Sequence, residues 1–327
     1  FFIGAVSLMS AAATKSRHFL IDVLLVSMVT IWALNYSVIK RAFAEVPAQP
    51  FNALRMAIAA VLFLATLGGT ALAVRGGRRV SSILYTPVRA TRAEWMRMAV
   101  LGIVGHFCYQ FCFARGINGT SVSNSALIIG ATPVVVAISS AVLGHERLSL
   151  RHWAGAAVSA LGIYLVVGHG AAFGGAHLTG DLYMIASVLC WASYSVGAAS
   201  LVKHHSPLFV TGTTFAIGAV PYVLMSWPAM REVPWLHLST YVYVAVSGSA
   251  LLALFASYII WYTGVQAFGV ARTSLYSNLV PVAALIIARL WLGEPITTIK
   301  VIGAAAVLSG LALTRLGARA SSIPPEE

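Results

Sequence analysis

The sequence predicts an all-α membrane protein with ten transmembrane helices, arranged as two five-helix repeats that are inverted relative to each other. Of its 327 residues, 59% are hydrophobic and only 9% are charged, whereas a soluble domain has about 25% charged residues. The apolar residues fall into ten runs close to the length that a helix needs to cross a bilayer, about 20 residues. A set of residues also recurs at a constant offset, which indicates a duplication.

The ten apolar runs define the expected spans. In the first half they are Phe19–Ile39, Phe51–Val74, Trp95–Phe113, Asn118–Leu143 and Trp153–Val167. In the second half they are Asp181–Leu201, Leu208–Trp227, Tyr241–Gly264, Thr273–Leu292 and Ile299–Leu316. We therefore expect a cytoplasmic tail (1–18), a first repeat (19–168), a linker (169–180), a second repeat (181–316) and a second cytoplasmic tail (317–327). The first residues lack the basic region of a signal peptide, so either Met9 starts the protein or the sequence begins further upstream.

The duplication holds across a proline, an acid and three glycines. Gly116, Val122, Pro133, Glu146, Gly155 and Gly162 return 148 positions later as Gly264, Val270, Pro281, Glu294, Gly303 and Gly310. At the start of each half, Asp22 and Trp32 return 159 positions later as Asp181 and Trp191. Because each half has an odd number of spans, the second half enters the membrane from the opposite side, as in many secondary transporters.

The distribution of basic residues predicts the orientation in the membrane. One set of connections carries most of them: Lys15, Arg17, Arg75, Arg78, Arg79, Arg89, Arg92, Arg147, Arg151, Lys203, Arg272, Arg315 and Arg319. The opposite connections hold Lys40, Arg41, Arg115, Arg231 and Lys300. The larger set marks the cytoplasm, so both termini are expected there. This rule explains the net charge of +12, and no basic run has the aromatic interleaving of a nucleic-acid surface.

The acidic residues of the repeat have structural explanations. Asp22 and Asp181 each open the first span of their half, where a helix N-terminus favours a carboxylate; a proton-carrier role is the weaker alternative. Glu146 and Glu294 end the proline-containing spans, where each could cap a helix or pair with an arginine, as Arg289 could with Glu294.

Aromatic and neutral polar residues supply the candidate binding site. They lie inside spans, where polar groups are costly unless they face protein or water. The candidates are Trp32, Asn35, Tyr36, His106, Tyr109, Trp191, Tyr194, Tyr258, Trp261, Tyr276 and Asn278. Ordinary helix packing is the alternative for any one of them. It also explains the aromatic residues near span ends, which suit an interfacial belt.

Two residues within spans leave alternatives open. His106 could titrate near neutral pH and couple transport to protons, but a neutral histidine bonded to a neighbouring helix is an equal alternative. Arg55, early in the second span, is either an anchor that snorkels to the interface or a contact for an anionic group; its position near the helix start favours the anchor.

Prolines and glycines of the repeat predict bending and close packing. Pro133 and Pro281 each remove a backbone hydrogen bond within a helix, so they are candidate hinges. Gly155 and Gly162 lie seven residues apart on one helical face, as do their repeat mates. Small faces of this kind let membrane helices approach closely and could extend to a dimer contact.

These features resemble the EamA-type members of the drug/metabolite transporter superfamily. The resemblance rests on the double pattern P-x12-E-x8-G-x6-G, on the W-x-x-N/Y pattern of the first span and on the segment ALRMAIAA around Arg55. It covers about Asp22 to Leu316. It implies ten helices around a central cavity lined by both halves, and export or exchange of small metabolites, often amino acids, across a bacterial inner membrane. His106 and Arg289 are not part of the pattern.

The leading functional prediction is a secondary transporter of a small neutral or zwitterionic metabolite, with an amino acid favoured, working by alternating access. An organic cation or drug-like solute is the alternative, since a cation could bind over Trp32 or Trp191.

A membrane-embedded enzyme would need a catalytic constellation, which the sequence lacks; a receptor is not expected to have inverted halves. No cofactor or metal is predicted, because GxxxxGK[ST] is absent and the three cysteines have no ligand companions. The expected partners are a small-molecule substrate and the lipid bilayer, with the chain a monomer or homodimer.

Overall fold

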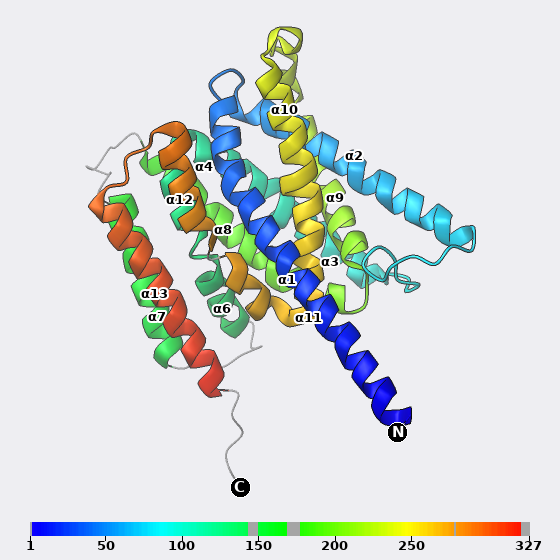
Figure 1. The fold of residues 1–327 in the computed structure, drawn as a ribbon. Coiled ribbons are helices and arrows are strands. Elements are labelled where there is room, and N and C mark those ends of the chain that lie inside the picture. The colour runs from blue at the N-terminus through cyan, green and yellow to red at the C-terminus, as the bar shows by residue number, and fades with distance from the viewer. Residues whose placement is uncertain (1, 143–149, 169–176, 278, 322–327) are drawn as a thin grey trace.

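The computed structural model describes residues 2–142, 150–168, 177–277 and 279–321. Within these ranges the chain is helical, without a strand (Figure 1). Six helical segments are long and apolar enough to cross a membrane, and four shorter apolar helices complete the set. The expected all-α membrane fold is confirmed.

The first repeat contains the helices from α1 to α7. Their bounds are α1 Phe2–Ala42, α2 Ala48–Arg75, α3 Arg92–Gly102, the π-helix η1 Ile103–Cys108, α4 Tyr109–Gly119, α5 Val122–Ile129, α6 Thr132–Val142 and α7 Leu150–Gly168. Residues 2–18, predicted as a tail, continue the first helix. The helices α3, η1 and α4 form one continuous span, Arg92–Gly119.

The second repeat repeats this order. Its elements are α8 Leu178–Ala199, the 3-10 turn η2 Leu201–Lys203, α9 Pro207–Arg231, the 3-10 turn η3 Trp235–His237, α10 Thr240–Gly248, the π-helix η4 Ser249–Ala256, α11 Ser257–Ser277, α12 Leu279–Leu292 and α13 Thr298–Ser321. The π-helix η4 lies 148 residues after the corresponding part of η1, so a local irregularity of the third span is duplicated in the eighth.

The contacts between helices follow a two-fold pattern. Within the bundle, α1 packs on α11 and α12, while its repeat mate α8 packs on α4 and on α5 and α6. Two pairs of mates pack directly on each other, α2 on α9 and α7 on α13. Each contact of one repeat on the other therefore has a counterpart, and the axis that relates the halves passes through the middle of the bundle.

The pair α7 and α13 shows that the repeats are inverted. A Cβ built on Gly162 would lie 2.8 Å from Gly303 O, and one built on Gly310 would overlap Gly155 O. The earlier glycine of α7, Gly155, meets the later glycine of α13, Gly310, and Gly162 meets Gly303. This pairing requires the two helices to be antiparallel. Helices α7 and α13 lie side by side (Figure 1) and are repeat mates, so the two halves run in opposite directions. The small faces predicted from the sequence thus pack against each other within one chain.

Adding a methyl group at Gly310 should destabilise this helix pair. In Gly310→Ala the Cβ would meet Ser159 N at 2.6 Å, besides the Gly155 carbonyl, and overpacking of a tight contact costs about 1–3 kcal/mol. The melting temperature in detergent should fall accordingly. In the matched control Gly68→Ala, which has nothing within 4 Å of the new Cβ, it should stay level or rise. Equal melting temperatures for the two variants would contradict this packing.

The predicted fourth span is interrupted where the sequence indicated a single helix. Helix α5 ends at Ile129 and α6 begins at Thr132. The physical reason is that a residue preceding a proline avoids the helical region, so a break before Pro133 is favoured. In the second repeat, a helix break occurs at Gly269, whose φ of 81° only glycine adopts readily.

Pro133 therefore lies in a first turn, as the second residue of α6. Proline is tolerated there because the first N–H groups of a helix have no intrahelical partner. Pro133 thus stands at a helix start and not within a helix interior. In the second repeat, residue 278, three positions before Pro281, lies outside the described residues. The break before α6 contacts Pro281, since a Cβ on Gly130 would lie 2.5 Å from Pro281 Cγ.

Candidate functional site

A cavity lies between the two repeats. It encloses about 620 Å³ of non-atom space, a figure that includes its opening. Every crossing segment except the outer pair α7 and α13 and helix α9 contributes to its wall. The lining residues are Trp32, Asn35, Tyr36, Arg55, Tyr109, Gln110, Phe113, Ile129, Thr132, Trp191, Ala253, Leu254, Tyr258, Ser277 and Val280.

Repeat mates meet at this cavity. The ring centroids of Trp32 and Trp191 are 6.1 Å apart in an edge-to-face arrangement. Gln110 Nε2 donates to the hydroxyl of Tyr258 at 3.4 Å, and these two residues lie 148 positions apart in the sequence. Residues related by the duplication can touch only close to the axis that relates the halves. The cavity therefore lies on that axis.

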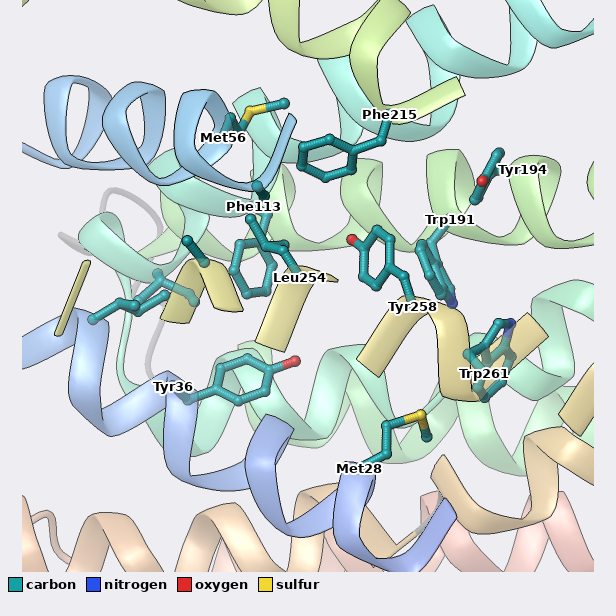
Figure 2. Close-up of a cluster of buried hydrophobic side chains, with 14 of the residues drawn as sticks. Met28, Tyr36, Met56, Phe113, Trp191, Tyr194, Phe215, Leu254, Tyr258 and Trp261 are labelled. Carbon is teal, nitrogen blue, oxygen red and sulfur yellow. The ribbon is translucent and has the colours of Figure 1, made fainter. Parts of the chain in front are cut away.

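One end of the cavity is aromatic. Trp191 is its centre, with ring centroids at 5.3 Å from Tyr109, 5.3 Å from Tyr258 and 6.0 Å from Trp261. Trp32 is fixed by a hydrogen bond of 3.0 Å from its Nε1 to Ala253 O in η4. Figure 2 shows Tyr36, Phe113, Trp191 and Tyr258 reaching the same space from separate helices. A wall of this composition suits apolar and aromatic groups, because it buries apolar surface area and offers ring-to-ring contacts.

The other end is polar and built around Arg55. Its side chain is only 1% exposed, so the interpretation as an interface anchor is wrong. Arg55 Nη1 donates to Ser249 Oγ at 3.1 Å, and Nη2 donates to Asn52 Oδ1 at 2.5 Å and to Gln110 Oε1 at 2.7 Å. Ser249 Oγ donates in turn to Asn35 Oδ1 at 2.5 Å. The network joins both repeats.

Of the residues predicted from the sequence, some line the cavity and others do not. The structure places Trp32, Asn35, Tyr36, Tyr109, Trp191 and Tyr258 in its wall. Trp261 packs behind the two tryptophans, and the Tyr276 hydroxyl donates to Asp22 Oδ1 at 2.6 Å. Asn278 lies outside the described residues.

His106 and Tyr194 lie behind the wall rather than in it. His106 is fully buried and its Nε2 is 3.1 Å from Thr214 Oγ1 on α9. The Tyr194 hydroxyl lies 2.8 Å from the same oxygen, and its ring is 4.5 Å from the imidazole. The arrangement is that of the alternative considered for His106, a histidine bonded to a neighbouring helix.

Sequence reasoning missed the part of the wall that lies just before the two repeat prolines. Ile129 and Thr132 flank the break before Pro133, and Ser277 and Val280 precede Pro281 in the sequence. The signal for the first pair was present in Pro133, because a break before a proline exposes side chains and backbone that a continuous helix would cover.

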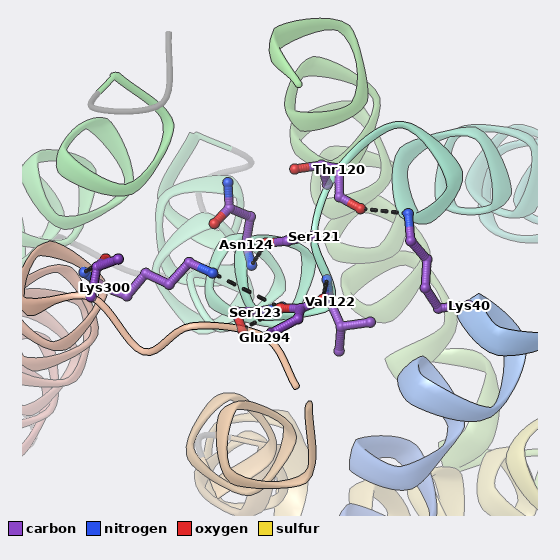
Figure 3. Close-up of polar contacts among 9 residues, drawn as sticks. Lys40, Thr120, Ser121, Val122, Ser123, Asn124, Glu294 and Lys300 are labelled. Carbon is purple, nitrogen blue, oxygen red and sulfur yellow. Dashed lines mark hydrogen bonds and ion pairs between the residues drawn. The ribbon is translucent and has the colours of Figure 1, made fainter. Parts of the chain in front are cut away.

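Glu294 lies in the connection between α12 and α13, where its side chain contacts the start of α5 (Figure 3). Its carboxylate accepts hydrogen bonds from Val122 N at 2.8 Å, Ser123 N at 3.1 Å and Ser123 Oγ at 2.7 Å, so it caps α5 of the other repeat. Lys300 Nζ lies 3.9 Å away. The alternative pairing with Arg289 is not formed, since Arg289 is exposed on α12. The mate Glu146 lies outside the described residues.

Lys40, near the end of α1, binds the C-terminal end of α4. Its Nζ donates to Ile117 O at 2.6 Å, Asn118 O at 3.0 Å and Thr120 O at 2.7 Å, the last carbonyls of α4 and its C-cap. A cation at a helix C-terminus and an anion at a helix N-terminus are both favoured by the helix dipole. The two side chains tie α1, α4, α5 and the α12–α13 connection together.

Removing the charge of Glu294 should loosen the start of α5. In Glu294→Gln, one amide oxygen replaces two charged oxygens, and hydrogen bonds to charged groups contribute about 1.5–3 kcal/mol. Amide hydrogen exchange at Val122 and Ser123 should therefore become roughly tenfold faster or more. Glu232→Gln, at an exposed carboxylate beyond α9, should leave both amides unchanged. Unchanged protection in Glu294→Gln would show that the cap is not formed.

A known family matches nearly the whole chain. The model of the EamA-like transporter family matches residues 19–168 and 178–316. The uncharacterized transporter YyaM of Bacillus subtilis is 33% identical over 215 residues, which cover 65% of this chain and 70% of the relative. A probable terminal-alkyne amino-acid exporter of Streptantibioticus cattleyicolor is 27% identical over 310 residues, covering 90% of this chain and 97% of the relative.

A solved structure supports the fold. A crystal structure of a protein 22% identical in sequence superposes with a TM-score of 0.63, covering 94% of this chain and 99% of that chain. The likeness extends over both halves, so the overall fold is shared.

Proposed function

The chain belongs to the EamA-like transporter family, and from this premise we propose that it is a secondary transporter of a small neutral or zwitterionic metabolite, with an amino acid the favoured cargo. The observation that carries the proposal is the position of the cavity on the axis relating two inverted repeats. A site on that axis is bordered by residues of both halves throughout a rocking motion of one half against the other. Alternating access requires a site of this kind.

The chemistry of the wall supports a cargo with an apolar or aromatic part. Trp32, Trp191, Tyr109 and Tyr258 offer ring faces, while Asn35 and Gln110 offer amide groups. The relative named as an amino-acid exporter matches nearly the full length of the chain, and this supports an amino acid as the cargo. The proposed location is a bacterial inner membrane with both termini in the cytoplasm, as the basic connections indicate.

Pro133 and Pro281 are the proposed hinges. At Pro133 the helix is interrupted, and an interruption has fewer backbone hydrogen bonds than a continuous helix, so bending is least costly there. This break contributes Ile129 and Thr132 to the cavity wall, and Gly130 within it lies against Pro281 of the other repeat. A change of angle at this break would therefore reach the cargo and the other repeat directly.

Counterflow in proteoliposomes tests the proposal. Vesicles preloaded with each unlabelled amino acid are diluted into its labelled form, and uptake above that of protein-free vesicles is expected for at least one of them. A parallel panel of quaternary amines tests the organic-cation alternative. If no amino acid moves while the protein remains folded and monodisperse, the amino-acid proposal is wrong. Movement of amines alone would establish the alternative.

A further inference from the structure

We propose that Arg55 is the receptor for a carboxylate group of the cargo, so that the cavity selects amino acids and related monocarboxylates over their amides and amines. The inference rests on the proposed function and assigns the chemistry of one end of the same cavity. It starts from a buried charge that the described part of the chain does not neutralise.

Arg55 is a buried cation without an acidic partner. It is 1% exposed, and its described hydrogen-bond acceptors are an asparagine amide, a glutamine amide and a serine hydroxyl, all neutral. The ion pairs found among the described residues join His205 to Glu94 and Lys300 to Glu294, and neither includes Arg55. Among the described residues, none that lines the cavity is acidic.

Such a charge is costly to bury unless an anion joins it. Neutral dipoles solvate a guanidinium only in part, and buried charges in proteins are usually paired. Arg55 also retains an unused donor, because its Nε is buried and has no hydrogen-bond partner among the described residues. A guanidinium in this state fits a carboxylate well, since its planar fork donates two parallel hydrogen bonds to the two oxygens.

The geometry orients a bound carboxylate relative to the aromatic end. Gln110 accepts from Arg55 at 2.7 Å and donates to the Tyr258 hydroxyl at 3.4 Å, and the Tyr258 ring lies 5.3 Å from Trp191. Two side chains thus separate the guanidinium from the tryptophans. A molecule with a carboxylate at one end and an apolar body at the other, such as an amino acid, would place the carboxylate on Arg55 and the apolar body on the rings.

The anion would also act on both halves at once. Arg55 and Gln110 belong to the first repeat, and Ser249 and Tyr258 belong to the second. A carboxylate that takes donors of Arg55 competes with Ser249 and Gln110 for the guanidinium. Cargo binding would therefore change a hydrogen bond that joins the two repeats, at the axis about which they are related.

The test compares acids with amides in which only the charge is removed. L-phenylalanine, L-leucine and 3-phenylpropionate are paired with their carboxamides, and phenethylamine is the amine control. Binding to the full chain in detergent is measured as ligand-induced thermal stabilisation and as competition for the labelled amino acid found in counterflow. The wild-type protein should bind at least one acid about tenfold or more tightly than its amide.

Variants then assign the preference to Arg55. Arg55→Gln should remove the preference for the acid, and Arg55→Lys, which keeps the charge without the fork, should retain part of it. Arg115→Gln is the matched control, because Arg115 is exposed on α4 and stacks on Phe111 at 4.4 Å; it should leave the preference unchanged. A structural role for Arg55 would lower the melting temperature without changing the ratio of acid to amide affinity.

The outcomes separate this inference from the transport proposal. Equal binding of acids and amides by the wild type, a preference that survives in folded Arg55→Gln, or no binding of any of the three acids would each overturn the role of Arg55. Movement of amino acids in counterflow with any of these results would leave transport standing. Acid binding that depends on Arg55, without movement of any amino acid, would instead overturn amino-acid transport and leave the carboxylate site standing.

Discussion

Replacing Trp191 with alanine should reduce transport by roughly one to two orders of magnitude. Trp191 is 6% exposed and its ring contacts Trp32, Tyr109, Tyr258 and Trp261, so it holds the aromatic end of the cavity together. Truncating a buried aromatic residue to alanine costs about 3–5 kcal/mol, and here both the binding face and its supporting contacts are lost. Counterflow at matched protein amounts measures the effect.

Two further variants separate binding from folding. Trp191→Phe keeps a ring in the same position and should restore part of the activity, with weaker binding rather than a lower amount of folded protein. Trp227→Ala removes a tryptophan that is 56% exposed on α9 and should leave transport at the wild-type rate. Equal transport by the folded Trp191→Ala and Trp227→Ala proteins would exclude Trp191 from the cargo site.

Replacing Gly180 with alanine should lower the stability of the protein more than Gly310→Ala does. The new Cβ would lie 2.6 Å from Gly119 O and 2.7 Å from Thr120 N, both backbone atoms. Backbone cannot rotate away as a flexible side chain can, so the end of α4 and the start of α8 must separate. The cost should reach the upper end of the roughly 1–3 kcal/mol typical of overpacking.

Thermal unfolding in detergent measures this effect. The crossing joins the last turn of the third span to the first turn of the sixth, beside Asp181, which is 2% exposed. Gly69→Ala is the control, since nothing lies within 4 Å of its Cβ, and its melting temperature should stay level or rise. A melting temperature of Gly180→Ala equal to that of the control would contradict the close backbone approach.

The architecture was predictable because the sequence contains an internal duplication. Periodic recurrence at fixed offsets identified the mates, and in the structure mates pack on one another: Trp32 on Trp191, and the glycine face of α7 on that of α13. Span positions followed from hydropathy, which depends only on composition. These features are properties of sequence segments, and no knowledge of three-dimensional contacts was needed to read them.

The role of Arg55 could not be predicted from its position alone. A residue near the start of a span is usually close to the interface, but α2 begins against α4 and η4 inside the bundle. The side chain is buried by segments far away in the sequence, including Ser249. The same holds for His106, which lies well inside its span but faces Thr214 of α9 rather than the cavity. The depth of a residue in the membrane does not determine whether its side chain faces the cavity or a neighbouring helix.

The measurement that most directly tests a cargo path along the axis between the repeats is the accessibility of Ile129, which lines the cavity at the break before α6. Ile129→Cys is made in protein with Cys108, Cys112 and Cys190 replaced by alanine, and is treated with a membrane-impermeant thiol reagent from each face separately. Labelling from both faces, slowed in each case by the transported amino acid, is the predicted result. Labelling from neither face, or labelling that the amino acid does not slow although it is transported, would contradict a cargo path through this cavity.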